Sequence, residues 1–152
     1  MKEHGDYTVG ESGQVVLLSG RGPWNDETLK QGASDTSKII VSVSKRGPWG
    51  QLSYLSGESL MPPSTFKTFI ERTQERKNLG MQALAIVITD SDIVNTIKAQ
   101  LTQAYLPLGV THQFFNEIDD AITWLQGRNL TLSVSEVHEF FQKNAFHKQS
   151  TK

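Results

Sequence analysis

The residues best suited to binding chemistry lie in a repeated tetrapeptide. Arg-Gly-Pro-Trp occurs twice, at residues 21–24 and 46–49. Each copy directly follows an apolar stretch expected to be a strand, and ligands of open α/β sheets collect where parallel strands end. The repeat therefore predicts that Arg21, Trp24, Arg46 and Trp49 form a basic and aromatic rim. Such a rim suits an anionic group, an aromatic ligand or a partner protein.

The alternative interpretation of the repeat is structural. Gly-Pro is a common turn dipeptide, and each tryptophan then fills one end of the core.

Two acids and one histidine are the candidates for catalysis. Asp90 and Asp92 follow a predicted central strand, and His112 lies in another predicted strand. Together they suggest a small hydrolase-like enzyme as the alternative function. Helix capping explains both acids without any further assumption, and a strand histidine among apolar neighbours is usually structural.

Other catalytic and cofactor signatures are missing from the sequence. There is no phosphate-binding loop, dinucleotide fingerprint or Gly-x-Ser-x-Gly elbow. The histidines lack metal-ligand spacing; they are His4, His112, His138 and His147. We therefore expect no catalytic residue, no metal site and no cofactor.

Bulk properties favour a small cytoplasmic protein of bacterial type. The chain has 152 residues, a formal net charge of −1 and no cysteine. That length fits one packed core, and the balanced charge gives no indication of nucleic-acid binding. No apolar run approaches the roughly 20 residues that span a bilayer. Residues 1–6 lack the apolar segment of a signal peptide.

The catalytic candidates Asp90, Asp92 and His112 lie in a predicted strand–helix–strand–helix pattern from residue 82 to 126. Residues 84–89 form a continuous apolar run, typical of a strand covered on both faces. The Asp-Ser-Asp sequence at 90–92 is expected to cap a helix with apolar positions from 93 to 105, ended by Pro107 and Gly109. A strand is expected at 110–115. A helix capped by Asn116 and ended by Gly127 follows.

The N-terminal half is less regular. Residues 7–19 are expected to form an antiparallel hairpin, Asn25 or Asp26 to cap a short helix, and residues 38–44 to form a strand. The long stretch 45–63 is expected to be a loop, with a helical turn or an edge strand at 52–55.

A helix is then expected from Pro63 and Ser64 to about residue 80. Phe66 and Phe69 would lie on its buried face, as core or as the lining of an apolar pocket. Arg72 and Arg76 would lie on its solvated face.

The last helix carries its own capping box, Ser133 and Glu136. Val134, Val137, Phe140 and Phe141 line one of its faces. We divide the chain into a domain at 1–127 and a helical extension at 128–152. The extension is expected to cover the open side of the sheet or to exchange with a second chain, giving a homodimer.

The order of elements indicates an α/β fold. It comprises an N-terminal hairpin, a mixed and mostly parallel sheet of four or five strands, packed helices and an extra C-terminal helix.

From residue 14 onward this order resembles the STAS superfamily of anti-sigma-factor antagonists, particularly its SpoIIAA-like branch. Residues 15–20 resemble the first core strand and its Ser-Gly exit, and residues 39–43 resemble the second. The Gly-Pro-Trp at 47–49 stands where this branch often has Gly-Trp. Residues 85–88 and 116–125 resemble a later strand and the closing acidic helix.

The resemblance implies a non-enzymatic regulatory or ligand-binding domain. The occupant of its rim would be a protein partner or a small apolar, lipid-like or anionic ligand. In the antagonists, a serine near the matching region 53–64 is phosphorylated. Ser56 and Ser59 are the nearest candidates here, although the Asp-Ser-Ser/Gly pattern is missing.

Overall fold

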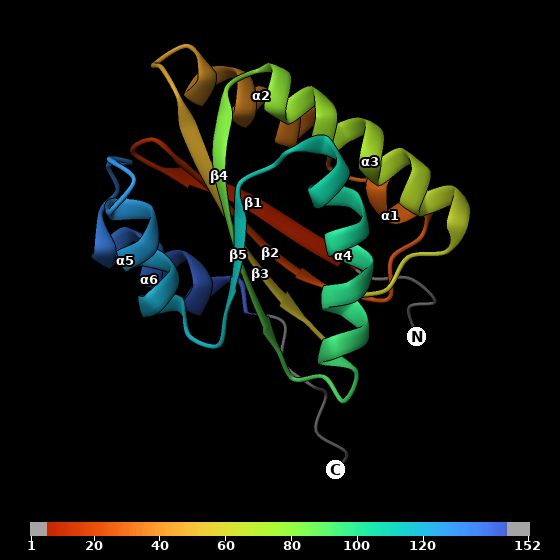
Figure 1. Ribbon diagram of the computed structural model, residues 1–152. Helices are drawn as coiled ribbons and strands as arrows, with labels where there is room; N and C mark the ends of the chain where they lie inside the picture. The colour runs from red at the N-terminus through yellow and green to blue at the C-terminus, as the bar shows by residue number, and fades with distance from the viewer. Residues whose placement is uncertain (1–5, 146–152) are drawn as a thin grey trace.

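The computed structural model describes residues 6–145, which form one five-stranded sheet with helices on both of its faces (Figure 1). Along the chain the elements are β1 (Asp6–Ser12), β2 (Val15–Arg21), α1 (Asp26–Lys30), α2 (Ala33–Ser44), β3 (Trp49–Ser56), α3 (Pro63–Asn78), β4 (Met81–Thr89), α4 (Val94–Leu108), β5 (His112–Phe115), α5 (Ile118–Gln126) and α6 (Val134–Lys143).

The sheet follows the chain order β1-β2-β3-β4-β5. β1 and β2 form the antiparallel hairpin, and β2, β3, β4 and β5 run parallel to one another. The predicted α/β fold, with its N-terminal hairpin, mostly parallel strands and C-terminal helix, is confirmed.

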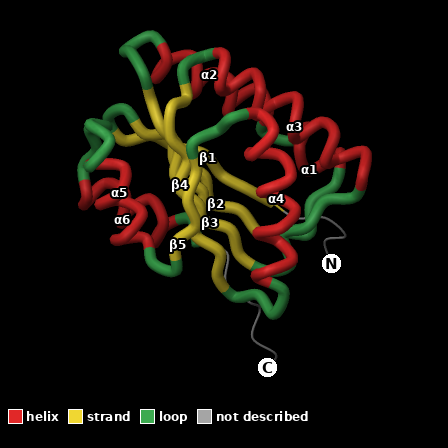
Figure 2. The backbone as a smooth tube through the Cα atoms, in the orientation of Figure 1, coloured by secondary structure: helices red, strands yellow, loops and turns green. Residues whose placement is uncertain are grey.

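Two helical layers enclose the sheet, and β4 shows how the sequence separates them. Leu84, Ile86 and Ile88 pack in the cluster beneath α1, α2, α3 and α4. Ala83, Ala85 and Val87 alternate with them and pack in the cluster beneath α5 and α6. Figure 2 shows the strands lying between the two sets of helices. A strand buried on both faces needs the continuous apolar run that predicted it.

The predicted strand at 38–44 is wrong, because these residues belong to helix α2. Ile40 and Val43 are buried, while Val41 is 41% exposed. Burial therefore repeats at helical spacing on one face, and a central strand would bury all three. Apolar β-branched residues suit either structure, and here helical packing decides.

The missing strand is β3, in the stretch expected to be mostly loop. Residues 52–55 belong to this central strand, hydrogen-bonded to β2 on one side and β4 on the other. Gln51, Ser53 and Ser56 are buried within it. These polar residues interrupt the apolar pattern by which a buried strand is recognised.

The helix ends agree with the sequence in several places. Asn25 and Thr28 form a capping box at α1, α3 begins at Pro63, and α4 ends at the left-handed Gly109. Two expected caps are wrong. The N-caps of α4 and α5 are Ile93 and Glu117, and neither accepts a capping hydrogen bond on its side chain.

Helix α6 covers the sheet face beside α5, which is the covering alternative expected for the tail. Ser133 Oγ accepts a hydrogen bond from the Glu136 amide, while the Glu136 carboxylate accepts one from Ser12 Oγ at 2.7 Å. Val137 and Phe141 are buried in the same cluster as β2, β3 and β4. The helix is thus joined to the hairpin turn by polar contacts and to the core by apolar ones.

We predict that Phe141→Ala lowers the free energy of unfolding by about 3–5 kcal/mol, because it empties a buried aromatic site. Val134→Ala, at a position 43% exposed on the same helix, should change it by less than about 0.5 kcal/mol. Urea denaturation followed by circular dichroism measures both. Equal effects of the two substitutions would contradict a docked α6.

Candidate functional site

The two Arg-Gly-Pro-Trp copies lie at opposite ends of the sheet. Arg21 ends β2 and pairs with Ser56 at the carboxyl end of β3. Trp49 begins β3, one residue before Gly50, which pairs with Val15 at the start of β2. The second copy follows a helix and precedes a strand, so the expectation of one shared rim is wrong.

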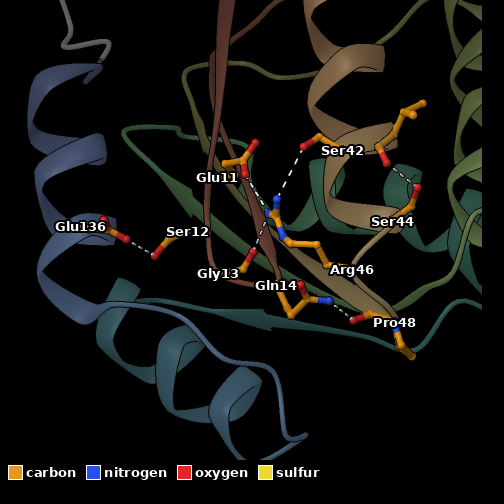
Figure 3. Close-up of polar contacts among 10 residues, drawn as sticks. Glu11, Ser12, Gly13, Gln14, Ser42, Ser44, Arg46, Pro48 and Glu136 are labelled. Atoms are coloured by element: carbon orange, nitrogen blue, oxygen red, sulfur yellow. Dashed lines mark hydrogen bonds and ion pairs between the residues drawn. The ribbon is translucent and has the colours of Figure 1, made fainter.

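The second copy has structural contacts. Arg46 forms an ion pair with Glu11 at 2.7 Å and donates a hydrogen bond to the Gly13 carbonyl at 2.9 Å, which closes the hairpin turn against the end of α2 (Figure 3). Trp49 is fully buried, and its indole N–H donates to the Leu79 carbonyl at 3.0 Å. These contacts support the structural interpretation for this copy.

The first copy lies at the carboxyl edge, where the chain turns back over the sheet. Arg21 forms an ion pair with Asp90 at 2.8 Å. Ser56 Oγ donates to the Gly20 carbonyl, and Ser59 Oγ donates to the Ser56 carbonyl. Both serines are at most 2% exposed, so the folded structure does not present their hydroxyls to a modifying enzyme.

The three catalytic candidates do not converge. His112 pairs with Leu84 near the start of β4, and its Nδ1 contacts the Val110 carbonyl at 2.8 Å. Asp90 lies six residues beyond Leu84, roughly 20 Å away at the usual strand rise. Asp92 follows in the same loop. Within residues 6–145, no group of three or more His, Asp or Glu side chains is placed to hold a metal ion. No helix in that part of the chain has the length and apolarity needed to cross a bilayer.

The candidate site is a cavity of about 80 Å³ between the sheet and helices α1, α3 and α4. Its walls are mostly apolar and come from segments far apart in the sequence: Tyr7, Leu18, Trp24, Leu29, Leu55, Met61, Phe69, Met81, Leu84, Leu101 and Tyr105. This space lies within the apolar layer of the larger helical face.

Trp24 forms one wall because the backbone beneath it has no side chain. A Cβ at Gly20 would lie 2.4 Å from the Trp24 ring, so glycine allows the indole to lie against β2. The Trp24 amide donates to the Leu60 carbonyl at 3.0 Å, and the Tyr7 ring lies 6.0 Å from the Trp24 ring. The carboxyl-edge loops thereby hold the indole at the cavity.

A line of polar groups crosses the apolar surface of the sheet and faces the cavity. Arg76 Nη1 donates to Gln51 Oε1 at 3.1 Å, and Gln51 Nε2 donates to Ser53 Oγ at 2.9 Å. The arginine fixes the orientation of the amide, since guanidinium is only a donor. Because Ser53 Oγ accepts this hydrogen bond, the hydroxyl hydrogen of Ser53 can be donated to another acceptor.

Arg76 forms no ion pair in the described part of the chain, and the acid beside it on α3 is Glu75. The hydrogen-bond partner of Arg76 is the neutral amide of Gln51, and burial lowers the pKa of its guanidinium. Arg72, one turn earlier on α3, donates to the Leu29 carbonyl. The cavity wall contains two arginines and no Asp or Glu. Both arginines are half-buried, and charges drawn out of water are normally paired, so this cavity has the electrostatics of an anion site.

Tyr105 adds a further donor to the wall. Burial raises the pKa of its hydroxyl, and the charge of Arg76 partly opposes that rise. The phenol is therefore neutral at physiological pH and can donate a hydrogen bond. Two guanidinium groups and the Tyr105 and Ser53 hydroxyls make the wall rich in donors.

Only part of this site was anticipated from the sequence. Trp24 and Ser59 line the cavity. Phe69, for which the sequence allowed either a core position or a pocket wall, lines it as well. Arg72 and Arg76 were expected on a solvated face, whereas both are half-buried and line the cavity. Their spacing was informative, because residues 69, 72, 73 and 76 share one helical face.

We predict that Gln51→Leu lowers the free energy of unfolding by about 3 kcal/mol, because it leaves the Arg76 charge without an acceptor. The double variant Gln51→Leu/Arg76→Met should recover most of that loss, since no charge remains. Urea denaturation of all four proteins gives the coupling energy. As a control, Gln51→Leu combined with Arg46→Met should be additive within about 0.5 kcal/mol. Additivity in both cycles would contradict the Arg76–Gln51 contact.

We also predict that the stability decreases above pH 10 because of Tyr105. Its folded pKa lies above its unfolded value of 10.0, so the unfolded chain releases this proton first. Stability is then complete below pH 10 and decreases at higher pH by up to about 1.4 kcal/mol per unit. Between pH 8 and pH 10.5, the free energy of unfolding should decrease less in Tyr105→Phe than in the wild-type protein. Equal decreases in the two proteins would exclude this role.

No protein-family model and no curated protein matches this chain. The STAS-like resemblance thus rests on the order of elements and on short motifs. One of those motifs, residues 39–43, lies in helix α2 and cannot be the second core strand.

Proposed function

We propose that this protein is a non-enzymatic module that binds a small amphipathic anion in the cavity beneath α3. One observation carries the proposal: the Arg76 guanidinium reaches an apolar cavity and has no carboxylate partner in residues 6–145. A bound anion would supply the missing charge, and the surrounding side chains would bury an apolar group.

The cavity volume limits the apolar part of the ligand. An engineered apolar cavity of about 150 Å³ in another protein holds benzene, and the cavity here has about 80 Å³. A branched group of about four carbon atoms is the matching size. Burying it contributes about 0.8 kcal/mol for each methylene-sized group.

The polar groups favour a carboxylate as the anion. Guanidinium binds planar carboxylates through two parallel hydrogen bonds. The hydroxyls of Ser53 and Tyr105 are further donors in the same wall. The STAS-like resemblance agrees with a binding module, but the proposed site differs from the strand-end rim that the resemblance implied.

The test is the binding of isocaproate, a carboxylate with a branched four-carbon end, measured by isothermal titration calorimetry at pH 7. We expect a dissociation constant on the order of 1 mM or below. Arg76→Met should weaken binding by at least about tenfold, because it removes a charge-assisted hydrogen bond. The affinity of Arg76→Lys for isocaproate should lie between those of the wild type and of Arg76→Met, since lysine keeps the charge but lacks the planar guanidinium group.

Arg46→Met is the matched control. The charge of Arg46 is instead paired with Glu11, at the far end of α2. Its removal should leave isocaproate binding unchanged. No binding to the wild-type protein, or equal weakening by both arginine substitutions, would refute the proposed function.

A further inference from the structure

A second hollow lies outside the cavity, between helices α2 and α3. Its volume is about 350 Å³, and one helical face of α2 and one of α3 line it. Tyr7, Arg72 and Arg76 belong to the walls of both hollows. These three side chains therefore separate an inner apolar space from a larger outer groove.

Thr36 gives the groove an unsatisfied polar group. The residue is 6% exposed, and its Oγ1 has no hydrogen-bond partner. A threonine within a helix usually bonds the carbonyl one turn earlier, as Thr73 does here with Phe69. Buried hydroxyls are rarely left unpaired, so the Thr36 hydroxyl, at the wall of the groove, lacks a partner.

Glu75 gives the same groove a negative charge beside the two arginines. It lines the groove with Thr36 and Ser37, whereas no Asp or Glu lines the inner cavity. The inner cavity is mostly apolar, the two arginines belong to both walls, and the outer groove adds the Thr36 hydroxyl and the Glu75 carboxylate. A ligand that matches this order has an apolar end, a carboxylate and, next to it, a cationic donor.

We propose that the ligand class is a free α-amino acid with a branched aliphatic side chain, and that the groove binds its ammonium group. This inference rests on the proposed function, because Arg76 holds the carboxylate in both. The side chain lies in the inner cavity, and the ammonium donates to Thr36 Oγ1 and to the Glu75 carboxylate. Charge-assisted hydrogen bonds of this kind are the strong ones.

A matched pair of ligands tests the inference. Isocaproate is L-leucine without its amino group, so the two differ only at the group assigned to the groove. Calorimetry at pH 7 should show that the wild-type protein binds L-leucine at least threefold more tightly than isocaproate. Thr36→Val and Glu75→Gln should each weaken L-leucine binding by about threefold to tenfold and leave isocaproate binding within twofold.

Thr68→Val is the control substitution. Thr68 lies on α3 outside both hollows, and its hydroxyl contacts the Ser64 carbonyl. It should alter neither affinity. Unchanged isocaproate binding also shows that the Thr36 and Glu75 variants fold normally.

The outcomes separate the two proposals. Isocaproate binding that equals or exceeds L-leucine binding in the wild-type protein overturns the amino-acid assignment and leaves the anion site standing. If Thr36→Val and Glu75→Gln weaken the binding of L-leucine and of isocaproate equally, the amino-acid assignment is likewise overturned. Failure of both ligands to bind the wild-type protein overturns the proposed function and this inference together.

Discussion

The hydrogen bond from Arg76 to Gln51 joins helix α3 to the centre of the sheet, and the larger helical layer is arranged around it. A guanidinium brought into an apolar layer must retain a polar acceptor, since its desolvation is costly. Gln51 provides one, and Ser53 fixes the amide by accepting its other end. The apolar side chains around this line cannot close over it, and a cavity remains beside it.

The opposite face of the sheet shows packing without such a constraint. Val15, Leu17 and Leu52 meet α5 and α6 in a continuous apolar cluster. Neither of the two hollows lies there. The two faces of β3 thus differ. Leu52 and Tyr54 pack in the apolar cluster beneath α5 and α6, while Gln51 and Ser53 present polar groups to the cavity.

The sequence predicted those parts of the fold in which local preference and burial agree. Residues 84–89 read as a buried strand because both faces of β4 are apolar. Asn25, Pro63, Gly109 and Ser133 marked helix ends through their own local chemistry. These signals are contained within a few residues, so a single sequence carries them.

The errors arose where tertiary contacts decide the structure. Residues 38–44 have strand-like composition, but only one side of the segment meets the core, so a helix forms. Gln51 and Ser53 of β3 line the cavity, and their polar side chains interrupt the apolar pattern that would have predicted a strand. Because residues 38–44 form a helix and residues 49–56 form the strand, the second tetrapeptide precedes a strand and the first follows one. The two copies therefore lie at opposite ends of the sheet. Arg76 was unrecognised as a site residue because its neutral partner lies 25 positions away.

The contact between Ser12 and Glu136 joins segments 124 residues apart in the chain. Contacts at such separation form late, because a long stretch of chain must first be closed into a loop. During synthesis, the hairpin emerges from the ribosome long before the helix that covers it. Its apolar side, including Val15 and Leu17, therefore lacks the cover of α6 until residues 134–143 have been made. During that interval the uncovered apolar surface favours association between nascent chains.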